Sequence, residues 1–348
     1  MWSKKAEDWI YGLVPKENTP QDIAVTTISA NEEYLQIYLR SMRIVNAGKG
    51  FSSFYAAVHS WISVAHRSGD DAQFRVLTSP NNLKELDAKR LQNVITASVP
   101  LLGPIPYRGG KVGLEIGLFS IKSRDLAAPF LSLITDLSKA SGVSFINAAA
   151  PFLDPIKNGV EMLTGSSDNT QLELGLIDNL TSIQTGYYLT IRAPKDKYKM
   201  EDFAIDTDRR LVYKTSGQPV NEFPYMIFQV FTTKTRDDFF KIPEIQKTYK
   251  KLQDKVAGVK NYDQVSDLLD LLRIQLLSSN DLIQADGKKI YASIEKEIHE
   301  LFPDTNTSGA VSANLRSASL KDLHKLDIFA PEAKPATDTG WSSAEEDS

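Results

Sequence analysis

The chain has 348 residues, of which 42% are hydrophobic and 24% are charged, a composition that is ordinary for a globular protein of about two domains. Its 44 acidic and 40 basic residues give a net charge of −4, which argues against a broadly basic nucleic-acid-binding protein. It contains no cysteine, so disulfides, thiol nucleophiles, iron–sulfur clusters and cysteine-rich zinc sites are excluded.

The first eight residues, MWSKKAED, are too polar for a signal peptide. No apolar stretch reaches the length of a membrane-spanning helix, which is about 18 residues or more. We therefore expect a cytoplasmic protein that has no transmembrane segment and does not associate with membranes.

Residues 1–30 are expected to form a short N-terminal helix and a linker. Ser3 is a suitable N-cap for a helix from Ser3 to Ile10. Pro15 and Pro20 then favour irregular structure.

Strand-like alternation begins at residue 34. In 34–45, one face carries Leu35, Ile37 and Leu39, and the other carries Tyr34, Tyr38 and Arg40. A turn at 46–50 and a second apolar run at 51–66 predict that these two strands form a hairpin. Another strand is expected at 73–78.

The next segment is rich in proline. A strand is expected from Val94 to Val99, and Pro100, Pro104 and Pro106 are expected to end regular structure there. The clearest alternation in the chain follows at 112–118. We expect its apolar side chains to face a core: Val112, Leu114, Ile116 and Leu118.

The second half of the chain mixes both periodicities. Helical spacing of apolar residues predicts an inserted pair of helices over 126–165. Strands are expected again at 171–176, 187–191, 210–214 and 225–233. Helices are expected to begin near Pro243, Asp263 and Asp281 and to continue to residue 302.

Together these elements predict an α+β fold, because the strands follow one another at short spacing without strict alternation with helices. We expect an antiparallel β-sandwich-like domain over 31–236, with the helical insertion at 126–165, and a helical subdomain over 237–302. The sandwich has a general analogy to C2-like folds, and such an analogy does not imply a function.

Residues 303–348 differ from the rest of the chain. This segment has eight acidic and four basic residues, so its net charge of −4 equals that of the whole chain. Few apolar residues are present, and we expect most of it to be disordered. An apolar island at 319–329 is the exception, and it is expected to bind either the body of the protein or a partner. Its apolar members are Leu320, Leu323, Leu326, Ile328 and Phe329.

Most catalytic motifs are missing from the sequence. It has no phosphate-binding loop of the GxxxxGK[ST] type, no dinucleotide fingerprint, no GxSxG nucleophile motif and no HExxH zinc motif. Acidic residues in predicted loops are the remaining candidates for a Ca²⁺ or Mg²⁺ site. They are Asp70, Asp71, Asp206, Asp208, Asp237 and Asp238. The alternative is that these residues form ordinary solvated turns.

A second candidate site is the segment from Arg108 to Lys111. Gly109 and Gly110 allow backbone N–H groups to point toward an anion beside two cations. The alternative, which the flanking alternation favours, is a glycine-rich hairpin turn.

Two functions remain after these exclusions. The first is a non-catalytic interaction or adaptor subunit, without a cofactor, which binds a protein partner through its β-rich body and its C-terminal tail. The alternative is an enzyme or Ca²⁺-binding module that uses the loop carboxylates and a divalent cation. The sequence favours the first, because no catalytic motif is present and residues 303–348 combine acidity with an apolar island.

Overall fold

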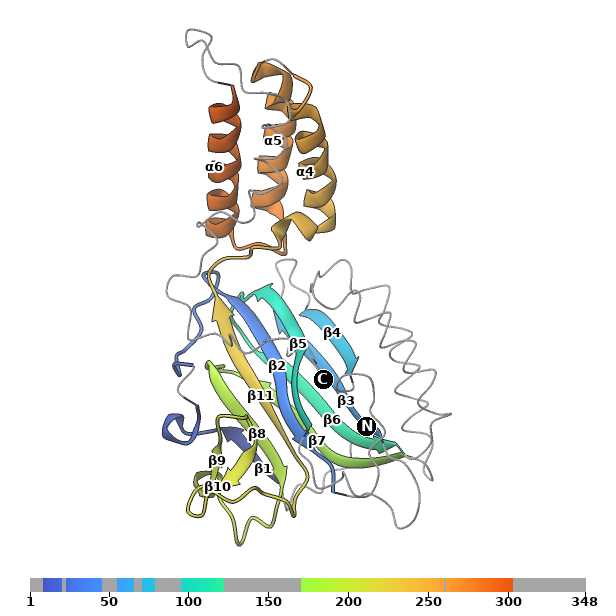
Figure 1. Ribbon diagram of the computed structural model, residues 1–348, viewed down its shortest axis with the longest axis vertical. Helices are drawn as coiled ribbons and strands as arrows, with labels where there is room; N and C mark the ends of the chain where they lie inside the picture. The colour runs from blue at the N-terminus through green and yellow to red at the C-terminus, as the bar shows by residue number, and fades with distance from the viewer. Residues whose placement is uncertain are drawn as a thin grey trace, which may run out of the picture.

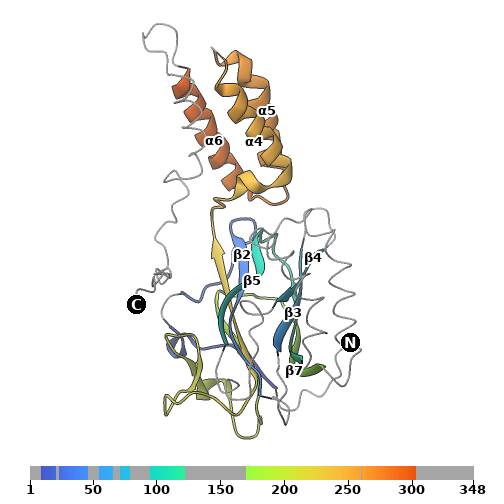
Figure 2. The ribbon, with the colours of Figure 1, turned by 45° about the vertical axis from the view of Figure 1, so that its right-hand side comes forward.

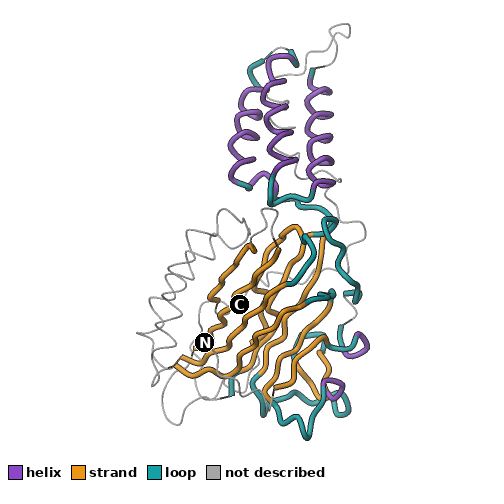
Figure 3. The backbone as a smooth tube through the Cα atoms, turned by 180° about the vertical axis from the view of Figure 1, so that it is seen from behind, coloured by secondary structure: helices purple, strands orange, loops and turns teal. Residues whose placement is uncertain are grey.

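The structure is a computed structural model, and it describes residues 9–20, 23–45, 55–65, 71–78, 95–121, 170–259 and 261–302. Within these ranges the protein is a mixed α+β fold with antiparallel sheets and three α-helices (Figure 1). The helices gather beyond one end of the sheets (Figure 3). No helix in the described ranges combines the length and the hydropathy needed to span a membrane.

The larger sheet has five strands in the order β1–β8–β11–β2–β5, and all neighbours in it are antiparallel. A 3₁₀ turn, η1 (Lys16–Asn18), follows its first strand. The five strands are β1 (Trp9–Leu13), β8 (Gly186–Arg192), β11 (Tyr225–Thr233), β2 (Tyr34–Arg43) and β5 (Ile95–Pro106).

The second sheet has four antiparallel strands in the order β4–β3–β6–β7. The chain therefore crosses from one sheet to the other between β2 and β3, between β4 and β5, between β5 and β6, and between β7 and β8. The four strands are β4 (Asp71–Thr78), β3 (Tyr55–Ala65), β6 (Val112–Ile121) and β7 (Thr170–Leu180).

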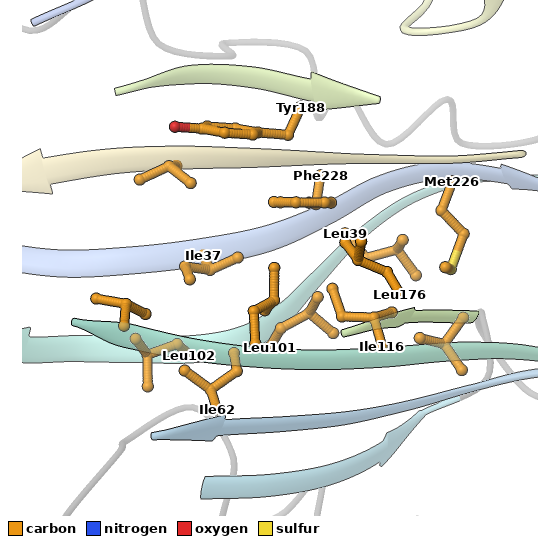
Figure 4. Close-up of a cluster of buried hydrophobic side chains, with 14 of the residues drawn as sticks. Ile37, Leu39, Ile62, Leu101, Leu102, Ile116, Leu176, Tyr188, Met226 and Phe228 are labelled. Atoms are coloured by element: carbon orange, nitrogen blue, oxygen red, sulfur yellow. The ribbon is translucent and has the colours of Figure 1, made fainter. Parts of the chain in front are cut away.

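One cluster of buried apolar side chains takes its members from both sheets. In Figure 4 side chains of the larger sheet, among them Ile37 and Phe228, face side chains of the second sheet, among them Ile62 and Ile116. The inward orientation predicted for 112–118 is confirmed, because its alternate apolar residues are at most 1% exposed. These are Val112, Leu114, Ile116 and Leu118.

A small two-stranded unit covers part of the outer face of the larger sheet. It consists of β9 (Phe203–Ile205), preceded by the 3₁₀ turn η3 (Met200–Asp202), and β10 (Leu211–Tyr213). A separate apolar cluster joins this unit to outward-facing side chains of β1, β8 and β11. The joined residues include Phe203, Leu211, Leu189, Ile191, Tyr225 and Ile227.

Three helices follow β11: α4 (Pro243–Val256), α5 (Asp263–Ser278) and α6 (Gln284–Leu301). A 3₁₀ turn, η4 (Phe239–Lys241), precedes them. Pro243 stands in the first turn of α4, where a missing N–H leaves no hydrogen bond unmade. The predicted starts at Pro243 and Asp263 are confirmed, and the third helix begins three residues after the predicted Asp281.

The apolar side chains that lie three and four residues apart form the core of this helical unit. The buried members include Ile245, Leu252, Val256, Val265, Leu269, Leu272, Ile290, Ile294 and Ile298. In Figure 2 the two sheets lie side by side, and the three helices stand beyond their ends.

Two strand predictions are wrong. β2 and β3 do not form a hairpin, because β2 pairs with β11 and β5, whereas β3 pairs with β4 and β6. Regular structure also does not stop at Pro100, since β5 continues to Pro106. Among the described residues β5 pairs only with β2, and its register shifts repeatedly. An edge strand tolerates prolines, because one side of it makes no ladder hydrogen bonds.

The predicted helix from Ser3 to Ile10 is wrong where the structure describes it. Trp9 and Ile10 belong to β1, where they pair with Arg192 and Ile191 of β8. Residues 1–8 and the predicted helical insertion at 126–165 lie outside the described residues, and so does the segment 303–348.

Substitutions of two isoleucines should differ in their effect on stability, because only one of the two residues lies in the core between the sheets. Ile116 is 1% exposed and Ile177 is 58% exposed. Ile116→Ala should lower the free energy of unfolding by about 2–5 kcal/mol, whereas the matched control Ile177→Ala should change it by less than about 0.5 kcal/mol. Urea unfolding followed by fluorescence measures both. Equal effects of the two substitutions would contradict the assignment of Ile116 to the core.

Candidate functional site

The predicted acidic candidates lie in separate parts of the molecule. Asp206 and Asp208 stand in the turn between β9 and β10, and both pair with Arg210. The Arg210 Nε atom lies 3.0 Å from Asp206 Oδ2. The guanidinium of Arg210 therefore supplies the positive charge that a cation would bring to these carboxylates.

The other acidic candidates do not join this pair. Asp238 forms an ion pair of 2.6 Å with Arg236 near the start of the helical unit, and its neighbour Asp237 is exposed. Asp71 is exposed at the start of β4, whereas Asp70 lies outside the described residues. Within the described residues, no three His, Cys, Asp or Glu side chains come together as metal ligands.

The segment 107–111 connects two different sheets, so the hairpin interpretation of this turn is wrong. Gly109 and Gly110 have φ values of 85° and 80°, a left-handed conformation that glycine adopts without strain. Arg108 turns toward the helical unit, where its guanidinium donates to the carbonyl of Leu282 at 3.2 Å. Lys111 is exposed. Arg108 therefore helps to hold the helices in place.

A buried polar network joins the larger sheet to the helical unit, and we call it the joint. The Tyr34 hydroxyl, at the start of β2, donates to Asp286 Oδ2 of α6 at 2.6 Å. The backbone N–H of Arg236 donates to the same oxygen at 2.9 Å. The Tyr34 hydroxyl in turn accepts from the N–H of Ile283 at 2.9 Å. β2, the segment after β11 and the start of α6 thus meet around one carboxylate.

The side chain of Arg236 is also part of the joint, and it is fully buried. Its Nη1 donates to the carbonyl of Pro104 in β5 at 2.9 Å and to the carbonyl of Asp281 at 3.2 Å. Its Nε donates to Asp238. A buried guanidinium needs such partners, because a charge removed from water is strongly destabilising unless hydrogen-bond acceptors surround it.

The surroundings of Asp286 in the joint change the pKa of its carboxyl group. Burial raises the pKa of Asp286 from 3.8 to about 6, although the hydrogen bonds from Tyr34 and from the Arg236 N–H oppose the shift. The second oxygen, Oδ1, accepts no hydrogen bond from a described residue. Burial also raises the pKa of Tyr34 well above its ordinary value. Tyr34 therefore remains a hydrogen-bond donor throughout the physiological range.

A different surface lies on the outer face of the larger sheet, and we call it the outer strip. It contains Gln36, Tyr38 and Arg40 of β2 and their neighbours Gln229 and Phe231 of β11. The β9–β10 unit covers this face on one side of the strip, and the helical unit covers Tyr34 on the other. Tyr38, Arg40 and Phe231 remain partly exposed between them.

The outer strip is a mutually packed group of aromatic and polar side chains. The rings of Tyr38 and Phe231 have their centroids 5.3 Å apart and are tilted by 48°. The guanidinium carbon of Arg40 lies 5.2 Å from the centroid of Tyr38. Arg40 also donates to Gln229 and to Ser98 of β5. These contacts fix the guanidinium and both rings before any ligand arrives, which lowers the entropy lost on binding.

The electrostatics of the outer strip keep Tyr38 neutral. Burial raises the pKa of Tyr38, the charge of Arg40 lowers it, and that of Asp238 raises it again. The strip therefore presents a phenol O–H, a guanidinium and an aromatic ring. Such a set suits the recognition of apolar and acidic groups.

The sequence alone predicts part of the outer strip. The alternation in 34–45 places Tyr34, Tyr38 and Arg40 on one face, but it does not identify Phe231 as their neighbour, because that contact depends on the pairing of β2 with β11. The apolar island at 319–329 lies outside the described residues. Comparisons of the chain with protein-family models, with curated proteins and with solved structures find no match.

The joint predicts a pH-dependent effect of Asp286→Asn. Because Asp286 has a higher pKa in the folded protein, the unfolded chain loses this proton first as the pH rises. Ionisation of Asp286 thus lowers the stability of the native protein progressively between pH 4 and pH 6, by about 3 kcal/mol in total. Asparagine keeps an acceptor for Tyr34 and cannot ionise. The free energy of unfolding of the variant, measured relative to that of the parent, should therefore rise by about 3 kcal/mol between pH 4 and pH 7.

Urea unfolding at a series of pH values measures this difference. Asp267→Asn, at an exposed position of α5, serves as the control for the change in charge. A difference between Asp286→Asn and the parent that stays constant with pH would contradict the raised pKa.

Proposed function

We propose that this protein is a non-catalytic, cytoplasmic interaction subunit that binds a protein partner at the outer strip, assisted by the apolar island at 319–329. In this proposal the two sheets form a β-sandwich that acts as a rigid support. The main observation behind this proposal is the packed group of Tyr38, Arg40 and Phe231, which stays partly exposed between two covered regions of the same sheet face.

The composition of the outer strip supports binding more than catalysis. Tyrosine and arginine are enriched among the residues that contribute most to protein interfaces. Gln229 and Gln36 are 1% and 8% exposed, so the polar residues between the rings are already fixed. The described part of the strip offers neither a histidine nor a carboxylate that would act as a general base.

The chemistry of the strip indicates the kind of segment that would bind. The exposed parts of the Tyr38 and Phe231 rings can pack against an apolar side chain, and the Arg40 guanidinium can donate hydrogen bonds to a carboxylate beside it. We therefore expect a partner segment that carries an acidic residue next to an aliphatic or aromatic one.

A paired substitution tests the outer strip. Tyr38→Ala with Phe231→Ala should abolish cross-linking to the partner in a lysate of the source organism and lower the affinity of the purified partner at least about 30-fold. Arg40→Glu should weaken binding at least tenfold, whereas Arg40→Lys should weaken it less, because lysine keeps the charge but not the planar fork.

Tyr291→Ala is the matched control, because Tyr291 is a partly buried aromatic residue on α6, outside the strip. All variants are compared by thermal melting to show that they fold. Binding that survives Tyr38→Ala with Phe231→Ala unchanged would exclude the outer strip as the binding surface.

The island predicts an effect of deleting residues 303–348. The truncated protein should melt within about 2 °C of the parent, because residues 9–302 supply the described cores. Its affinity for the partner should fall, because the partner loses the apolar contacts of the island. A large drop in melting temperature with unchanged affinity would mean that the island belongs to the core of the body.

A further inference from the structure

We propose that the acidic end of the chain, residues 335–348, docks on a basic face of α4 in the same molecule. The basic face consists of Lys247, Lys250, Lys251 and Lys255. This contact needs no partner protein, so it goes beyond the proposed function and is tested independently of it.

The four lysines share one side of α4. Their spacing of i, i+3, i+4 and i+8 places them on a single helix face, opposite the buried stripe that contains Ile245, Leu252 and Val256. All four are exposed, and none of them forms an ion pair with a described residue. Asp254 is the single carboxylate among them. The face therefore carries a concentrated positive charge without a partner among the residues described.

The complementary charge is at the far end of the same sequence. Residues 335–348 contain four acidic residues and no basic residue. Three of the four are consecutive, Glu345, Glu346 and Asp347, and Asp338 precedes them. This segment alone has the net charge of −4 that the whole chain has. Its four carboxylates thus have a sign opposite to the net charge of the lysine face on α4.

The length of the connection permits the contact. α6 ends at Leu301, and the acidic end begins 34 residues later. A flexible chain of this length has an average end-to-end distance of about 30 Å. Neighbouring helices pack with their axes about 8–10 Å apart, and α5 contacts both α4 and α6. All three helices stand together beyond the sheets (Figures 1 and 2), so α4 is within reach.

Weak ion pairs are sufficient for docking, because the acidic end and α4 belong to the same chain. Exposed lysine–carboxylate pairs are individually weak, but a flexible linker gives an effective concentration in the millimolar range. The docked state should therefore form at low ionic strength and dissociate when salt screens the charges.

Energy transfer between two dyes tests the contact in the full chain without any partner. Because the protein has no cysteine, Gln246→Cys on α4 and Ser343→Cys provide the only labelling sites. With dyes whose transfer distance is shorter than the roughly 30 Å end-to-end distance of the free linker, we expect high transfer at about 20 mM salt and low transfer at about 0.5 M salt. Lys250→Glu with Lys251→Glu should lower the docked-to-free ratio about tenfold or more.

Two further variants complete the experiment. Lys288→Glu with Lys296→Glu makes the same change in charge at exposed positions of α6 and should leave the transfer high. Glu345→Lys with Glu346→Lys should restore transfer to the variant with reversed charges on α4. Low transfer at low salt, transfer that persists at high salt, or equal loss in both lysine variants would overturn the proposal. Transfer between separately labelled molecules would overturn its intramolecular form.

Discussion

The buried guanidinium of Arg236 is the constraint on which the arrangement of the sheets and helices depends. A charge removed from water is strongly destabilising unless hydrogen-bond acceptors surround it. Its acceptors come from Pro104, Asp238 and Asp281, which belong to β5, to the segment before η4 and to the loop before α6. The helical unit cannot rotate against the sheet without separating this charge from at least one acceptor. The carboxylate of Asp286 adds a second such restriction, since Tyr34 and the Arg236 backbone share one of its oxygens.

The joint also determines which surfaces remain available. It holds the helical unit over Tyr34 at one end of the outer sheet face, and the β9–β10 unit covers the other end. The outer strip is what lies between them, so its exposure follows from the positions of two neighbouring units. Within the helical unit, α4 packs on α5, and its four lysines are exposed on the side opposite its buried residues.

Local sequence pattern predicted several of the described elements correctly, but it did not predict which strands pair with one another. Alternation identified the inward side chains of 112–118, and apolar spacing identified the helices that begin at Pro243 and Asp263, because each signal lies within one element. The predicted hairpin of β2 with β3 is wrong, because β2 pairs with β11 and β5, which lie much further along the chain. The acidic candidates show a different limit for the site. The sequence does not show whether separate loops converge, and Asp206 instead pairs with Arg210 within its own turn.

The net charge of the whole chain does not show where a charged segment would bind, because charges of one sign can gather on one surface. Residues 1–302 contain as many basic as acidic residues, so the sequence indicates a neutral body. In three dimensions the positive and negative side chains lie on different surfaces. α4 exposes four lysines on one face, whereas α5 exposes Asp263, Asp267 and Asp270. Within about one Debye length, roughly 8–10 Å, a ligand experiences the local charge and not the total. The local charge of α4 can therefore attract an acidic segment, although the body as a whole has no net charge to do so.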